Sequence, residues 1–254
     1  MTVCCYGSGE VDCRISPLAD AAFRVEAESV PRPAIPGWGR IKLWSPGPDE
    51  ITREVCSGVA ACLSAAFSSG VWSETPMPVG DETDPHSAAG IIAGQAECLQ
   101  LLLARFESGD KRNDDQEVLG CVVGTLLREP VLDAYGLREY GARPGDALLA
   151  YIGLVPAAQR TRVYVASDSS IKAASHSSDL AGGGCVHSLA SLMFTRWMEL
   201  PAIRSASCVF IRTRIVIGSI QHLAAKHDFQ LCGSFDINFR GQKQDRMVFR
   251  RRTV

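Results

Sequence analysis

Two apolar runs in the middle of the chain constrain its fold most. Residues 117–128 (EVLGCVVGTLLR) and 147–155 (ALLAYIGLV) are rich in aliphatic and β-branched side chains, with no charge in their interiors. Runs of this length and composition are typical of strands that are buried on both faces. The sheet that contains them must then be covered on both sides. The fold class we predict is therefore α/β (α+β), with helices on both faces of a central mixed sheet.

The other segments supply helices and strands in an order that suits this fold. Apolar residues at helical spacing predict helices at 50–68, from near Ser87 onward, at 186–199 and at 215–227. Further strands are predicted at 41–44, 208–211, 230–239 and 244–250, the last two as a hairpin around Gly241. Residues 101–107 fit a strand or a longer second helix, and 129–145 and 164–184 are predicted as loops.

The length of 254 residues, 46% of them hydrophobic, suffices for a sizeable core. Residues 1–38 hold Pro31, Pro33 and Pro36 and are predicted to be an irregular N-terminal extension, with one domain at 39–254. A net charge of −2 gives no electrostatic footprint for nucleic acid. Because there is no apolar run of about 20 residues and no signal peptide, we expect no membrane partner and a cytoplasmic protein.

Ten scattered cysteines form no C-x-x-C pair and no zinc spacing with histidine. We therefore expect no metal site and no disulfide framework, which suits a reducing compartment. Cys121 and Cys208 stand inside apolar runs, where a free thiol behaves as a small hydrophobic side chain.

The segment 146–184 carries the chemistry. The second apolar run ends at Pro156 and is followed by Gln159, Arg160 and Arg162, then by the glycines Gly182, Gly183 and Gly184 and a helix. A helix N-terminus presents free N–H groups, glycines let a ligand approach the backbone, and arginines add charge. This order predicts a phosphate-binding site, although it fits neither the P-loop nor the dinucleotide fingerprint.

These residues resemble those of the GNAT superfamily of acyl-CoA N-acyltransferases. Leu154-Val155-Pro156 with Gln159-Arg160 resembles the start of the family's pyrophosphate-binding motif, and Leu119-Gly120 resembles a family signature in a strand. His227-Asp228-Phe229 and the pair Asp245 and Met247 match later positions. The resemblance covers roughly residues 39–251.

The resemblance implies a mostly antiparallel sheet in which the strands at 147–155 and 208–211 are parallel and splay apart. It implies acetyl-CoA as co-substrate and direct transfer of an acetyl group to a primary amine of a small molecule. Backbone groups of Leu154 and Val155 would hold the pantetheine arm. The pyrophosphate would be held by Gln159, Arg160, Arg162, Gly182, Gly183 and Gly184.

The sequence departs from the family at two places. The glycines come late, so residues 163–181 are interpreted as an insertion that either closes over the donor as a lid or forms a passive loop. Ala224 stands where many members carry a tyrosine that protonates the departing thiolate. Candidate catalytic groups are Asp146, Tyr151 and His222, each of which also suits an ordinary role as loop carboxylate, sheet tyrosine or surface histidine.

Two other functions stay open. The donor can be a long-chain acyl-CoA or an acyl carrier protein, whose acidic surface would meet a basic rim made of Arg138, Arg143, Arg160, Arg162, Lys172 and the terminal arginines. Alternatively the chain binds an acyl-CoA without turnover, as a sensor or scaffold. The sequence also leaves a homodimer open.

Overall fold

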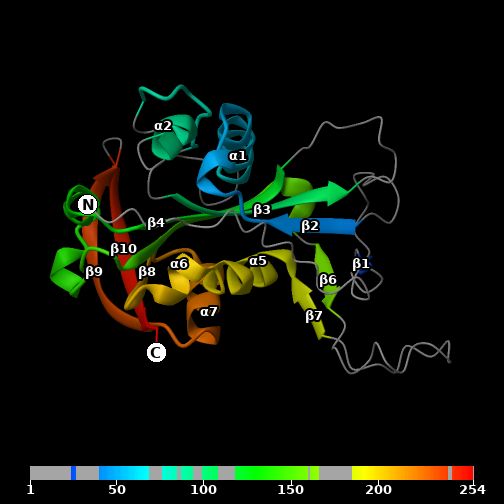
Figure 1. Ribbon diagram of the computed structural model, residues 1–254. Helices are drawn as coiled ribbons and strands as arrows, with labels where there is room; N and C mark the ends of the chain where they lie inside the picture. Colours follow the sequence, from blue (N-terminus) through cyan, green and yellow to red (C-terminus); the bar gives the residue numbers. More distant parts are fainter. Residues whose placement is uncertain are drawn as a thin grey trace.

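The strands of the protein form two sheets in the computed structural model, which describes residues 24–26, 40–68, 76–84, 87–93, 99–107, 118–159, 161–165, 185–239 and 242–253. The larger sheet has seven strands in the order β2-β3-β4-β5-β8-β10-β9, and the smaller has three in the order β1-β6-β7 (Figure 1).

The strands of the larger sheet are β2 (Arg40–Trp44), β3 (Leu99–Glu107), β4 (Val118–Leu126), β5 (Ala147–Leu154), β8 (Cys208–Arg214), β9 (Gln230–Phe239) and β10 (Gln242–Arg252). Those of the smaller sheet are β1 (Arg24–Glu26), β6 (Arg162–Val165) and β7 (Cys185–Ser188). The helices are α1 (Arg53–Ala66), α2 (Ala88–Ala93), α3 (Glu129–Ala134), α5 (Leu189–Met198), α6 (Pro201–Ser205) and α7 (Gly218–Lys226). Short 3₁₀ turns are η2 (Pro48–Glu50), η5 (Arg138–Tyr140) and η6 (Pro156–Ala158).

One strand pair in the larger sheet is parallel. Every other neighbouring pair is antiparallel, but β5 runs parallel to β8 and pairs with it only from Ala147↔Val209 to Leu149↔Ile211. Both strands continue beyond this point without pairing with each other. We call residues 147–149 and 209–211 the closed end of the pair, and residues 150–154 and 212–214 its open end. The predicted mixed sheet with a splayed parallel pair is confirmed.

The pairing of β5 with β8 ends at a β-bulge in β5. Tyr151 pairs with Val123 on β4 and Leu149 with Gly124, so Ala150 is an extra residue that has no partner on β4. A bulge bends its strand and increases the local twist. Because the last residue of β5 that pairs with β8 is Leu149, the bend begins where the two strands part.

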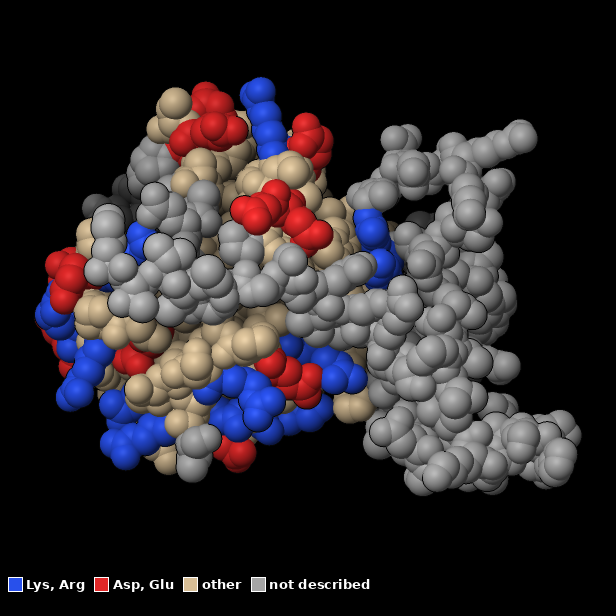
Figure 2. All heavy atoms as spheres, viewed as in Figure 1, with Lys and Arg blue, Asp and Glu red and all other residues tan. Residues whose placement is uncertain are grey.

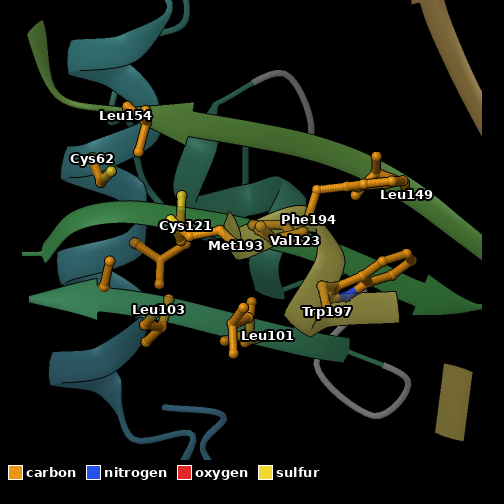
Figure 3. Close-up of a cluster of buried hydrophobic side chains, with 14 of the residues drawn as sticks. Cys62, Leu101, Leu103, Cys121, Val123, Leu149, Leu154, Met193, Phe194 and Trp197 are labelled. Carbon is orange, nitrogen blue, oxygen red and sulfur yellow. The ribbon is translucent and has the colours of Figure 1, made fainter. Parts of the chain in front are cut away.

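Helices cover both faces of the sheet, with α1 and α2 on one side and α5, α6 and α7 on the other (Figure 1). Met193, Phe194 and Trp197 of α5 lie against β3 and β4 (Figure 3), and all three are fully buried. Gly124 permits this packing, since a Cβ atom there would come within 2.1 Å of the Trp197 ring. None of the helices in the described part of the chain has the length and apolar character that a membrane span requires.

A second, smaller core lies on the face opposite α5, over the closed end. Leu148 of β5, Phe210 of β8 and Val248 of β10 are fully buried there against the segment 127–142. Alternation along β8 puts Ile211 on the α5 side and Phe210 on the other. The residues that follow at the open end therefore alternate in the same way, with Arg212 on the face of Phe210.

Several sequence-based boundaries were wrong. Residues 186–188, predicted as helix, belong to β7, because β6 provides hydrogen-bonding partners for them. Residues 164 and 165, assigned to a loop, form part of β6, while 166–184 lie outside the described residues. The predicted irregular extension contributes β1, which pairs with β6. The region 129–145 contains α3 and η5, and 101–107 is strand.

Candidate active site

A pocket of about 1000 Å³ lies at the open end of the β5–β8 pair and reaches Leu148, Leu149 and Ile211 of the closed end. It runs through the gap between the two strands. Its walls come from β5 and β8, from the first turn of α5, from α7, from the end of α1, and from single residues of β10 and of the end of α3. The pocket exists because the bulge in β5 leaves one edge of that strand without a neighbour.

The free edge of β5 presents backbone hydrogen-bonding groups to this pocket. Val155 donates its N–H to Leu119 O at 2.9 Å, on the β4 side. In an antiparallel pair, alternate residues turn these groups away from the partner strand. Ile152 and Leu154 therefore point theirs toward the gap, and Leu154 O there accepts from Gln159 Nε2 at 3.3 Å.

This register corrects one predicted binding residue and adds another. Of the predicted pair, Leu154 faces the gap, whereas the N–H of Val155 is used within the sheet. Ile152, which the sequence analysis did not single out, takes its place at the free edge and lines the pocket. The bulge decides which residues face the gap, and it is not visible as a sequence motif.

The first turn of α5 forms one end of the pocket. Ser188 caps the helix and accepts from Ser191 N at 3.2 Å, and Lys226 of α7 donates to Ser191 Oγ at 3.2 Å. His187, Ser188, Ser191 and Lys226 all line the pocket. The partial positive charge of a helix N-terminus and the Lys226 ammonium together favour an anion here.

The predicted phosphate ligands lie partly beyond what the structure describes. Arg160 and the glycines Gly182, Gly183 and Gly184 are outside the described residues, and only the backbone of Arg162 is described, in β6. Lys226 was missed by the sequence analysis. Its spacing from His222, four residues earlier on the same helix, places the two on one face and was the available signal.

Positive charge also gathers around this end of the protein. In Figure 2, Lys and Arg side chains cluster on the part of the surface where α6 and α7 lie, while Asp and Glu side chains gather over α1 and α2. One member of the basic rim predicted for a carrier protein is neutralised, because Arg138 forms ion pairs with Glu129 and Asp133.

No group of three or more His, Cys, Asp or Glu among the described residues could hold a metal ion.

Tyr151 lines the pocket from β5. Its ring meets that of Phe67 edge to face, with centroids 5.8 Å apart. Burial raises the pKa of Tyr151 far above its usual value, and the positive charges of Arg212 and Arg246 offset this only in part. The hydroxyl is therefore protonated at neutral pH and suits a hydrogen-bond donor better than a base.

His222 also lines the pocket, from α7. Ser219, Leu223 and Lys226 of the same helix line it too, as expected for neighbours at helical spacing. The imidazole is solvent-exposed. Ala224, at the position of the family tyrosine, is fully buried and lies outside the pocket lining.

Asp146 is not part of the pocket, which corrects its predicted catalytic role. It is 4% exposed, and both of its carboxylate oxygens accept backbone hydrogen bonds, Oδ1 from Cys208 N at 2.9 Å and Oδ2 from Arg143 N at 2.9 Å. The carboxylate joins the start of β5 to the start of β8. A base with both oxygens occupied and no access to the pocket cannot take a proton from a substrate.

Two arginines that the sequence analysis did not single out line the pocket. Arg212 of β8 and Arg246 of β10 lie next to Tyr135 and Tyr151 in its wall. Each stands in a strand of alternating polar and apolar residues, where an arginine ordinarily faces solvent. Their place in the pocket wall depends on how the sheet packs, so it could not be predicted from the sequence.

The arrangement of β5 and β8 decides the type of fold. A central, mostly antiparallel sheet carries one parallel pair that opens beside a helix N-terminus. This is the topology that the resemblance to the GNAT acetyltransferases implied. The sequence matches no protein-family model and no curated protein.

Solved structures similar to this chain include three acetyltransferases. One is a probable acetyltransferase of the GNAT family from Chromobacterium violaceum, with 14% identity, a TM-score of 0.46, and coverage of 91% of this chain and 96% of the other. The ribosomal-protein-S18-alanine N-acetyltransferase from Escherichia coli has 9% identity, a TM-score of 0.48, and coverage of 83% and 92%. An N-acetyltransferase from Staphylococcus aureus has 11% identity, a TM-score of 0.47, and coverage of 85% and 99%.

Proposed function

We propose that the protein is an acyl-CoA-dependent N-acyltransferase that moves an acetyl group from acetyl-CoA to a primary amine of a small molecule. The observation that carries this proposal is the free edge of β5 at the open end, next to the capped N-terminus of α5. A pantetheine arm needs backbone partners along an extended path, and its pyrophosphate needs an anion site at one end. The pocket offers both kinds of group in that order.

In this proposal the donor's phosphates lie at the first turn of α5, beside Lys226. The arm passes along β5, where Ile152 and Leu154 offer their backbone groups. The thioester then reaches the part of the pocket that Tyr151 lines. Arg160, Arg162 and the glycines Gly182, Gly183 and Gly184 are proposed to complete the phosphate site.

The reaction needs an aligned amine, a base and a route for a proton to the sulfur. The amine nitrogen attacks the thioester carbon, the carbon–sulfur bond breaks, one proton leaves the nitrogen and one reaches the thiolate. Tyr151 is proposed to donate a hydrogen bond to the oxygen that becomes negative during attack. His222 is proposed to move the proton, since it is the imidazole on the helix that carries the tyrosine in many related enzymes.

Calorimetry with CoA and an assay of thiol release test the proposal. We expect Lys226→Met to weaken CoA binding about tenfold, because it removes a charge-assisted hydrogen-bond donor from the phosphate site. Arg204→Met, which removes an exposed charge outside the pocket lining, is the matched control and should bind CoA normally. Replacing Arg160 and Arg162 together with Ala should also weaken binding.

The outcomes separate this proposal from the alternatives. Absence of CoA binding by the wild-type chain would refute it. CoA binding without transfer to any amine would instead favour a sensor or scaffold, and transfer only from long-chain donors or a carrier protein would replace acetyl-CoA as the donor. If His222 moves the proton, His222→Gln should lower kcat by roughly 10² or more and alter the pH profile.

A further inference from the structure

Two positively charged side chains share one wall of the pocket. Arg212 lies opposite Val248 in the β8–β10 pairing, and Arg246 lies opposite Arg214, two residues along. Both arginines therefore project from the same face of the sheet, the face of Phe210 and opposite α5. Both line the pocket at its open end.

Neither guanidinium has a carboxylate partner among the described residues. Arg212 donates to Tyr135 O at 3.1 Å and lies 4.4 Å from the centre of the Tyr135 ring. Arg246 is 9% exposed and donates from Nη2 to Gln244 Oε1 at 2.7 Å, and its buried Nε has no hydrogen-bond partner within the described structure. Within the described structure, Arg246 Nε is thus a buried donor that a ligand could use.

The electrostatics of the site agree with this geometry. Burial, followed by the nearby charges of Arg212 and Arg214, lowers the pKa of Arg246 to about 10. Burial likewise lowers the pKa of Arg212. Two cations that are withdrawn from water without a counter-charge destabilise the protein that holds them. Such an arrangement is typical of a site that receives its anion from a ligand.

We propose that Arg212 and Arg246 bind a carboxylate of the acceptor, so that the amine acceptor is an amino acid or a close relative of one. This inference rests on the proposed function. A donor held at the N-terminus of α5 approaches the gap from the α5 side, and the arginines lie on the opposite side, where the acceptor must enter. A planar guanidinium fork matches a carboxylate in both shape and charge.

The same wall indicates what else the acceptor carries. Phe67, Tyr135 and Tyr151 line the same pocket, the Tyr135 ring against Arg212 and the Phe67 ring against that of Tyr151. Aromatic walls favour an apolar or aromatic side chain over a charged one. Amino acids such as phenylalanine, tyrosine, tryptophan and leucine fit this description.

The test compares each amino acid with its own decarboxylated amine. Calorimetry in saturating CoA would use phenylalanine with phenethylamine, tyrosine with tyramine, tryptophan with tryptamine, and leucine with isoamylamine. We expect one or more amino acids to bind at least about 10-fold more tightly than the matching amine, and Arg246→Met to remove that preference. Arg214→Met changes the neighbouring arginine, which lies outside the pocket lining. This control variant should keep the preference for the amino acid over its amine.

A second measurement distinguishes a binding role from a structural one. Arg246→Met removes a buried charge without an ionic partner, so the ligand-free variant should unfold at a higher temperature than the wild type. An arginine that merely supports the fold would lower the unfolding temperature on removal. A lowered temperature together with an unchanged preference for amino acids would overturn the proposal.

The remaining outcomes locate any failure. Normal CoA binding with equal affinity for amino acids and amines, or with no binding of either, overturns this inference and leaves the proposed function standing. Absence of CoA binding refutes the proposed function, and the amino-acid preference is then measured without CoA. If Arg246→Met weakens succinyl-CoA but not acetyl-CoA, and leaves the amino acids unaffected, the carboxylate belongs to the donor and the acceptor assignment is wrong.

Discussion

The closed and open ends of the β5–β8 pair are built from the same two strands in opposite ways. At the closed end, Leu148 and Phe210 are fully buried, and both carboxylate oxygens of Asp146 have hydrogen-bond donors. At the open end, the same face of the sheet carries Arg212 and Arg246 without carboxylate partners in the described structure. Apolar packing and satisfied hydrogen bonds stabilise a fold, whereas unpaired buried charges do not. The closed end thus stabilises the fold, and the open end has the features of a binding site.

The largest expected effect is at the closed end. Phe210→Ala should lower the free energy of unfolding by about 3–5 kcal/mol, because it leaves a cavity in the smaller core. Urea denaturation measures the change, and Phe210→Leu, which keeps most of the volume, should cost much less. A loss below about 1 kcal/mol for the alanine variant would show that this core contributes little.

Asp146→Ala should have the next largest effect. It leaves the N–H groups of Cys208 and Arg143 without their carboxylate acceptor, so stability should fall by about 1.5–3 kcal/mol. Asp146→Asn keeps one acceptor oxygen and should lose less. The pH profile of acyl transfer should stay unchanged in both variants. Loss of the acidic limb of that profile, where the rate falls as the base becomes protonated, would instead restore Asp146 as the catalytic base.

Tyr151→Phe tests the open end with a minimal change. Its stability should stay within about 0.5 kcal/mol of the wild type, because the ring and its contact with Phe67 remain. Acyl transfer should nonetheless fall by roughly 10² if the hydroxyl stabilises the developing oxyanion. Equal kcat values for the variant and the wild type would remove this hydroxyl from the reaction.

The smallest expected effect concerns His227, at the C-terminal end of α7. Its ring meets that of Phe194 with centroids 4.7 Å apart. Burial, followed by the charges of Lys226 and Arg251, lowers the pKa of His227. The unfolded chain therefore binds the proton more readily, and stability should fall as pH falls through about 6.5 toward the lower, folded pKa.

Denaturation at about pH 7.5 and about pH 5.5 measures this dependence against that of His227→Gln. The variant should lose less stability between the two pH values than the wild type does. An identical loss in the two proteins would assign the pH dependence to other groups.

The sequence predicted best those elements that local pattern determines. The run at 147–155 was recognised as a buried strand because its apolar side chains are continuous, and the hairpin of β9 and β10 was recognised from two strand-like runs around Gly241. In contrast, Val186 and His187 form strand only because β6 pairs with them. No local preference reveals a partner that is distant in sequence.

In the candidate site too, some residues could be predicted from local pattern, whereas others depend on partners that are distant in sequence. Tyr151 and His222 were predicted, and both line the pocket, because each lies on an element whose position in the fold was anticipated. Asp146 was misjudged because its partner Cys208 is 62 residues away in sequence. Arg212 and Arg246 resembled surface residues of ordinary strands, since their burial depends on how three strands and α3 pack together.

The extra residue at Ala150 has a consequence for how the protein tolerates mutation. A bulge is one extra residue in a strand, and a replacement that keeps the hydrophobic pattern changes neither the residue count nor the register. Amino-acid replacements along β5 can therefore alter affinity and preference while the opening itself persists. Removing a single codon would instead allow the strand to pair regularly and would favour closure of the gap. At the level of the gene, we therefore expect the opening to be more sensitive to an in-frame deletion of three nucleotides than to a substitution of one.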